Sequence, residues 1–267
     1  MSNYLPAIPR RIIVAERNPD VALAVYNALK KFEYMPENIQ AMRAQHPDTV
    51  AFCMFAEPVE LYSDVRDVQR YGAAFISPAN SLVFMDGGID LVYSREMFPG
   101  VEAEARRAVH ALGLKTKLGR PYLPVGSAIT VPIPSDQACL IVAPTMFLPH
   151  DVSQTKNAFY AFMAALCAFG KYVAMTGNGH IDTLVTPGLC AGYGKMSPDE
   201  VARQMAEALS SYLRGRFMPQ MTDAPGLNDP MSYVTPSRDD EQPSNYDNRE
   251  IKDIPIENLL KPYQRVN

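Results

Sequence analysis

Short apolar runs of the β type alternate with segments of helical periodicity over about the first 215 residues, and this alternation restricts the possible folds more than any other feature. Strands are predicted at 11–15, 59–62, 73–76, 128–131 and 140–143, and either of two further apolar runs, 172–175 and 181–185, could be a strand. Helices are predicted at about 19–29, 37–45, 101–112 and 155–169, and from residue 198 onward. The pattern predicts an α/β domain of three layers, α/β/α, with a mixed or largely parallel central sheet covered by helices on both faces. In such folds ligands bind at the carboxyl ends of the strands.

Two of the helix starts carry clear capping signals. Asn18 can cap a helix that Pro19 opens. Ser197 is followed by a proline at the first helical position and by Glu200 three residues after the cap. Because these residues satisfy or tolerate the unpaired N–H groups of a first turn, both starts are predicted from local sequence alone.

Composition narrows the functional classes. The chain has 267 residues, 47% of them apolar and 20% charged, with a net charge of −4, so the basic surface expected of a nucleic-acid-binding protein is missing. The longest apolar stretch, 158–169, is too short to span a membrane, and no signal peptide is visible. Four scattered cysteines and four scattered histidines show no metal-ligand spacing. We expect a cytoplasmic protein with no metal, no cofactor and no membrane association, for which nucleic acid is not a main partner.

Composition also predicts a domain boundary. Residues 1–216 carry the strand and helix patterns, whereas 217–267 contain seven prolines, clustered charges and little apolar periodicity. Such a segment cannot build a second core. It is expected to be either a disordered tail or an arm that docks on its own domain or on a protein partner.

The first candidate ligand loop follows the apolar run at 73–76. It opens with Ser77-Pro78-Ala79-Asn80-Ser81, where the proline ends the strand and Asn80 presents an amide at the strand's carboxyl end. Asp86-Gly87-Gly88-Ile89-Asp90 comes five residues later. Paired glycines let a ligand approach the backbone closely, and Asp90 can face the same cavity from the first turn of a helix. The alternative is an ordinary turn with an aspartate cap.

The second candidate loop is glycine-rich and lies between a predicted strand and the capped helix. It reads Pro187-Gly188-Leu189-Cys190-Ala191-Gly192-Tyr193-Gly194. Backbone N–H groups in such a loop can bind phosphate beside the positive end of a helix. Neither the Walker A motif nor the G-x-G-x-x-G motif is present, and a plain connecting turn remains the alternative.

Together the two loops resemble those of the macrodomain (ADP-ribose-binding, Appr-1″-p processing-like) family, in particular its bacterial and phage-type variants with a Ser-Pro-Ala-Asn-Ser loop. The resemblance covers roughly residues 10–215, with gaps. It implies a macrodomain fold over 1–216 and an ADP-ribose pocket. The implied ligand-binding residues are Asp64, Ser77, Asn80, Gly87, Gly88, Gly188, Cys190, Ala191, Gly192, Tyr193 and Gly194.

The resemblance also implies a role for several of these residues. Asn80 would bond the distal ribose and Asp90 would serve hydrolysis, so these two are the candidate catalytic residues. Gly192 to Gly194 would hold the diphosphate, with Tyr193 near the distal ribose, and Asp64 would accept a hydrogen bond from the adenine amino group.

Three departures from the family pattern leave the activity open. Ser77 replaces the first asparagine of the common motif, Ser94 stands where hydrolytic relatives often carry histidine, and Cys190 stands where glycine is common. The leading hypothesis is an enzyme that removes ADP-ribosyl groups or a substituent of the distal ribose. The alternatives are a non-catalytic module that binds ADP-ribose or an NAD derivative, and an assembly protein, such as one of a virion, in which the domain is only a scaffold.

Overall fold

Six strands form one mixed sheet in the order β2-β1-β6-β3-β5-β4. The strands are β1 (Arg11–Ala15), β2 (Glu60–Tyr62), β3 (Ala73–Ser77), β4 (Ile129–Ile133), β5 (Ala138–Val142) and β6 (Thr183–Thr186). All neighbouring pairs are parallel except β4 and β5, which are antiparallel. The structure, a computed structural model, describes residues 7–32, 59–116, 119–176 and 180–213.

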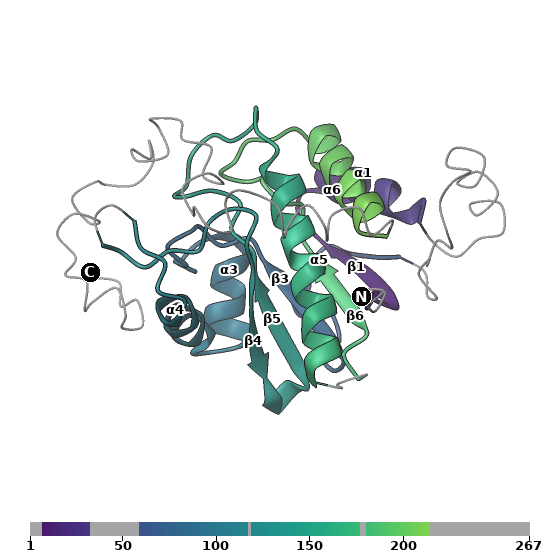
Figure 1. The fold of residues 1–267 in the computed structure, drawn as a ribbon. Helices are drawn as coiled ribbons and strands as arrows, with labels where there is room; N and C mark the ends of the chain where they lie inside the picture. Colours follow the sequence, from purple (N-terminus) through teal and green to yellow (C-terminus); the bar gives the residue numbers. More distant parts are fainter. Residues whose placement is uncertain (1–6, 33–58, 117–118, 177–179, 214–267) are drawn as a thin grey trace, which may run out of the picture.

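Helices cover both faces of the sheet (Figure 1). Helices α1 (Pro19–Lys30), α5 (Asn157–Thr176) and α6 (Pro198–Leu213) share one apolar core with one face of the sheet. The other core contains α3 (Gly88–Val92), the π-helical turn Tyr93–Met97 and α4 (Val101–Ala111). Successive strand residues enter opposite cores, as the pleat requires: Ile12 and Val14 belong to the first, Ile13 and Ala15 to the second. The predicted three-layer α/β fold with a mixed sheet is therefore confirmed.

Both predicted helix starts are confirmed at the level of individual atoms. The Asn18 side chain accepts hydrogen bonds from the N–H groups of Asp20 and Val21, and Pro19 begins α1. Ser197 Oγ accepts the N–H of Glu200 at 3.4 Å, and Pro198 begins α6.

The strand candidate at 172–175 is wrong, because α5 continues to Thr176. Gly170 lies inside this helix, beyond the predicted end at 169, and allows close packing. A Cβ atom on Gly170 would collide with the hydroxyl of Tyr212 from α6. The five strand predictions and the candidate at 181–185 are confirmed to within one or two residues at each end. The predicted helix at 37–45 and the tail at 217–267 lie outside the described residues.

The sheet topology fixes where a ligand can bind. Because β1, β2, β3, β5 and β6 are mutually parallel, their carboxyl ends lie at one edge of the sheet. The loops after these strands, which include both candidate ligand loops, therefore meet at that edge. Within the described segments, no helix is both long and apolar enough to cross a membrane.

Candidate functional site

A cleft of about 810 Å³ lies at this edge of the sheet. Loops after β1, β2, β3, β5 and β6 all contribute to its wall. Of the predicted site residues, it is lined by Asn80, Gly87, Gly88, Asp90, Gly188, Cys190, Ala191, Gly192, Tyr193 and Gly194. The two loops singled out in the sequence thus form one site, whereas Ser77 and Asp64 are not part of its lining.

The loop after β6 turns its carbonyl groups toward the protein and leaves its N–H groups unused. The carbonyl oxygens of Cys190, Gly192 and Gly194 accept hydrogen bonds from Met196, Lys195 and Val152 at 3.0–3.1 Å. The N–H groups of residues 189–194, in contrast, donate to no other described residue. Unpaired backbone N–H groups are rare in a folded protein unless water or a ligand accepts from them. A run of such groups facing a cleft can bind an anion.

Two glycines of the site are required by the protein itself. A Cβ atom on Gly188 would collide with the side chain of Val21 on α1. A Cβ atom on Gly194 would lie 2.5 Å from the carbonyl oxygen of Cys190 and 2.8 Å from Val152 Cγ2. These glycines therefore allow the loop to pack against its neighbours.

Two other glycines are not explained by packing. A Cβ atom on Gly192 would meet nothing within 4 Å, and one on Gly87 would make only an ordinary contact, 3.6 Å from Cε2 of Tyr193. Neither residue has the left-handed backbone that favours glycine. Both line the cleft, where the missing side chain lets a ligand approach the backbone closely.

Tyr193, which follows Gly192 in the chain, also lines the cleft. Its side chain is 58% exposed, and its ring is near Gly87. A large exposed ring in the lining of the cleft provides a surface on which a sugar ring or a base can stack.

Asn80 lines the cleft but also organises its own loop. Its Oδ1 accepts the N–H groups of Leu82 at 3.0 Å and Phe84 at 3.3 Å, and its Nδ2 makes a long 3.4 Å contact with the Phe84 carbonyl oxygen. An amide nitrogen carries two hydrogens, so one remains for a ligand.

Asp90 is paired with Ser77, which was predicted as a ligand contact. Ser77 Oγ, fully buried at the end of β3, donates to Asp90 Oδ1 at 2.7 Å. Burial raises the pKa of Asp90 to about 7; the Ser77 hydrogen bond opposes this shift, while the charges of Asp86 and Glu102 add to it. A carboxyl group with a pKa near 7 can exchange a proton at neutral pH. Ser77 therefore acts through Asp90 and not on the cleft directly.

Replacing Ser77 by alanine tests this pairing. Because the hydrogen bond stabilises the carboxylate, we expect the pKa of Asp90 to rise in Ser77→Ala, whereas Ser77→Thr keeps a hydroxyl and should keep the pKa. Carbon-detected NMR titration of the aspartate carboxyl groups measures it in the unliganded protein. An unchanged pKa in Ser77→Ala would refute the role of this bond.

Ser94 holds the backbone behind the cleft. Its Oγ donates to the Met85 carbonyl oxygen at 2.8 Å, and the Met85 N–H is bonded to Glu102 of α4. Ser94 is buried and does not line the cleft. It fixes the residue before the Asp86–Asp90 wall, a role that local sequence does not reveal.

Asp64 lies beside the cleft and is fully engaged there. Its Oδ1 accepts the backbone N–H and Nε of Arg66, both at 2.9 Å, and its Oδ2 accepts Nη2 atoms of Arg66 at 2.6 Å and Arg17 at 3.0 Å. These bonds, with Arg66 first, hold the pKa of Asp64 well below its usual range. Four donors leave no lone pair for the amino group of a base. The structure thus does not bring Asp64 into the role implied by the resemblance.

Sequence reasoning did not assign the loop after β1 to the site, although this loop supplies Glu16, Arg17 and Asn18 to the cleft. Glu16 Oε2 accepts the N–H of Gly188 at 3.1 Å and Oε1 accepts the N–H of Asn18 at 2.9 Å. Its carboxylate therefore links the glycine-rich loop to the start of α1. Only the fold reveals this contact, because 172 residues separate Glu16 from Gly188.

Cys190 is a packing residue. It is 4% exposed, and burial raises the pKa of its thiol, opposed by a hydrogen bond with Thr145. A neutral, buried thiol is a poor nucleophile.

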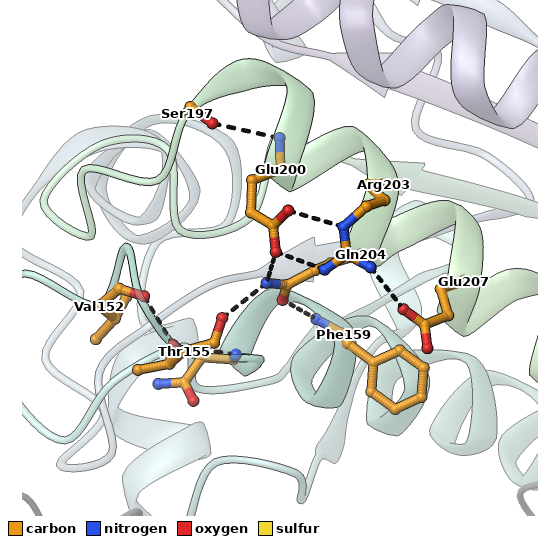
Figure 2. A network of polar contacts seen from close by, with 9 residues as sticks. Val152, Thr155, Phe159, Ser197, Glu200, Arg203, Gln204 and Glu207 are labelled. Atoms are coloured by element: carbon orange, nitrogen blue, oxygen red, sulfur yellow. Dashed lines mark hydrogen bonds and ion pairs between the residues drawn. The ribbon is translucent and has the colours of Figure 1, made fainter.

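Gln204 of α6 makes polar contacts with α5 and with the segment before it (Figure 2). These contacts connect through Val152 to the glycine-rich loop. Gln204 of α6 is fully buried; its Nε2 donates to the Thr155 carbonyl oxygen at 2.7 Å, and its Oε1 accepts the N–H of Phe159 at 3.1 Å. Thr155 in turn bonds through its N–H and Oγ1 to the carbonyl oxygen of Val152, whose own N–H donates to Gly194 at 3.0 Å. The network thus reaches the carbonyl oxygen of Gly194, the last residue of the glycine-rich loop.

Among the described residues, no group of three or more histidine, cysteine, aspartate or glutamate side chains is placed to hold a metal ion. No family model matches the chain. An uncharacterized protein of the archaeon Aeropyrum pernix is 33% identical to it over 145 residues. The match spans 54% of this chain and 66% of the length of that relative. The chain is therefore similar to an archaeal protein over about half its length.

Proposed function

We propose that the cleft binds ADP-ribose and that the protein hydrolyses ADP-ribosyl conjugates at the distal ribose, as a macrodomain-type enzyme. The main support is the loop at 189–194, whose N–H groups donate to no other described residue and of which residues 190–194 line the cleft. A diphosphate offers several anionic oxygens to such groups, and charge-assisted hydrogen bonds to backbone N–H are among the stronger ones. The sequence resemblance of both loops to macrodomains points to the same ligand.

The order of the strands suggests how the ligand would lie. The glycine-rich loop follows β6, which lies between β1 and β3. With the diphosphate at the β6 loop, one half of the ligand would extend toward the ends of β1 and β2, and the other toward the end of β3. Asn80, Gly87 and Asp90 belong to the β3 end, so the distal ribose would lie there and the adenosine at the β1 end.

Asp90 would act as the general base in this scheme. It would take a proton from a water molecule as the water oxygen attacks the anomeric carbon of the distal ribose. The bond from this carbon to the attached group breaks, and the leaving group keeps the electron pair and takes up a proton from solvent. Positioning by Asn80 and removal of one proton supply the catalysis, with typical factors of about 10² to 10⁴ for the base.

A second candidate is a module that binds ADP-ribose without cleaving it. Its support is that Ser94, at the position where hydrolytic relatives often carry histidine, is buried and bonded to Met85 instead of facing the cleft. Incubation with a mono-ADP-ribosylated protein distinguishes the two: release of ADP-ribose supports the enzyme, and binding without release supports the module.

Calorimetric titration with ADP-ribose tests the binding site that both candidates share. Asn80→Asp is the sharper variant, because it keeps the oxygen that holds Leu82 and Phe84 but removes the N–H donor. We expect saturable binding to the unmodified protein, weakened about tenfold or more in Asn80→Asp, as for the loss of a bond of roughly 1.5 kcal/mol. Asn80→Ala should weaken it as well, and equal affinity in all three proteins would refute the assignment.

A further inference from the structure

None of the described residues that line the β1 end of the cleft is aromatic. The aromatic rings of the described lining belong to Phe84, in the loop after β3, and Tyr193, in the loop after β6. The residues that line the cleft at and after the ends of β1 and β2 are Ala15, Glu16, Arg17, Asn18, Ser63 and Val65. The largest planar group among them is the guanidinium of Arg17.

Arg17 is held at this end by an ion pair between two loops. Its Nη2 donates to Asp64 Oδ2 at 3.0 Å, and its side chain is 61% exposed. Ser63 and Val65, on either side of Asp64 in the chain, both line the cleft, as Arg17 does. The ion pair therefore lies at the wall of the cleft.

Asp64 is fixed in turn by a second guanidinium. Arg66 binds both of its carboxylate oxygens, through Nε at 2.9 Å and Nη2 at 2.6 Å, and the Nη1 of Arg66 donates to Glu96 at 2.9 Å. An isolated ion pair on a surface contributes little, but a network with a two-point contact between arginine and carboxylate has a defined geometry. Cationic and anionic side chains alternate along this network, from Arg17 to Glu96, so its charges balance.

This arrangement suits Arg17 to a flat, uncharged partner. A guanidinium is planar and donates its hydrogen bonds in its own plane, so the bond to Asp64 leaves the two faces of the group for other contacts. Such a face stacks on aromatic rings. An anion would gain less from Arg17, because Asp64 already balances the positive charge.

We propose that the guanidinium of Arg17 stacks on the adenine base of ADP-ribose, and that Asp64 is the positioning residue that holds it there. The inference rests on the proposed function, because it assumes that the adenosine lies at the β1 end. Asp64 then contributes to binding of the base through Arg17 and not through a hydrogen bond to the amino group. The base is recognised by its face, at the end of the cleft where the described lining has no aromatic ring.

Calorimetric titration of Arg17→Ala and Arg17→Lys with ADP-ribose tests the stacking. We expect Arg17→Ala to weaken binding about three- to tenfold, as for the loss of a cation–π contact in a partly exposed site. Arg17→Lys keeps the positive charge but loses the planar group, so it should still weaken binding by about threefold or more. Arg107→Ala is the matched control and should leave the affinity unchanged. Arg107 is also 61% exposed and paired with a carboxylate, that of Glu104 on α4, but it does not line the cleft.

Asp64→Asn tests the positioning. It should weaken binding about two- to threefold in the unmodified protein and have no further effect in Arg17→Ala, since the two residues act as one unit. NMR of ¹⁵N-labelled protein supplies a direct signature of stacking. The Nε–H resonance of Arg17 should move upfield on saturation with ADP-ribose, because the ring current shields a proton over the face of a base, and it should move less in Asp64→Asn.

Full affinity in Arg17→Ala or in Arg17→Lys, or no upfield shift at saturation, would overturn the stacking. Binding of ADP-ribose to the unmodified protein would then leave the proposed function in place. An equal loss of affinity on Asp64→Asn with and without Arg17 would overturn the positioning role. Absence of ADP-ribose binding to the unmodified protein at millimolar concentration would remove the proposed function and this inference together.

Discussion

Asp90→Asn is expected to slow the release of ADP-ribose from a mono-ADP-ribosylated protein by about a hundredfold or more, while the affinity for ADP-ribose changes by no more than about threefold. The asparagine amide has nearly the same shape as the carboxyl group and can still accept the hydrogen bond from Ser77. It cannot take a proton from water. The change therefore removes the proposed general base and leaves the cleft in place.

The same reaction should depend on pH with a defined sign. The base is active only when it is ionised, and burial raises the pKa of Asp90 to about 7. The release rate should therefore rise as the pH increases through about 7 and then level off. Asp136→Asn is the control, with the same change of residue type far from the cleft. Release that continues at the normal rate in Asp90→Asn would exclude Asp90 as the base.

The second large effect is expected for Gly192→Val, on binding alone. A Cβ atom at this position meets nothing within 4 Å, and the backbone is not left-handed, so the free energy of unfolding should change by less than about 0.5 kcal/mol. The valine side chain would project into the cleft beside the N–H groups at 189–194. We expect ADP-ribose affinity to fall about thirtyfold or more, measured by calorimetry beside thermal unfolding.

Gly194→Ala gives the opposite pattern and serves as the comparison. Its Cβ would lie 2.5 Å from a backbone oxygen, which cannot move away easily, so the protein should lose about 1–3 kcal/mol of stability. If Gly192→Val bound ADP-ribose normally, the ligand would not approach the loop as we propose. If it unfolded instead, Gly192 would be a packing glycine like Gly194.

The elements that depend on neighbouring residues could be predicted from the sequence. The starts of α1 and α6 follow from Asn18-Pro19 and Ser197-Pro198, because a cap is satisfied within three residues. The end of α5 could not be predicted. Gly170 lies inside the helix, and its missing side chain leaves room for the hydroxyl of Tyr212, 42 positions later. No local signal contains that contact.

The candidate site also has one part that could be predicted from the sequence and one that could not. Glycine-rich loops after predicted strands were enough to predict that Asn80, Asp90 and Gly192 lie in one cleft. The reason is that parallel strands end at a common edge of the sheet. The partners of the carboxyl groups were not predictable. Whether Asp64 meets an arginine or a ligand, and whether Asp90 meets Ser77, depends on side chains that the fold brings together from other elements.

Backbone amide NMR of the ¹⁵N-labelled full-length protein, titrated with ADP-ribose, tests whether the diphosphate binds at the glycine-rich loop. The N–H groups of 189–194 have no acceptor among the described residues, so a diphosphate bound there should shift their resonances more than those of any other segment. We expect saturable shifts concentrated at 189–194 and at Gly87 and Gly88, where the distal ribose is proposed to bind. Saturable shifts confined to another part of the chain, or no shifts at millimolar ligand, would contradict it.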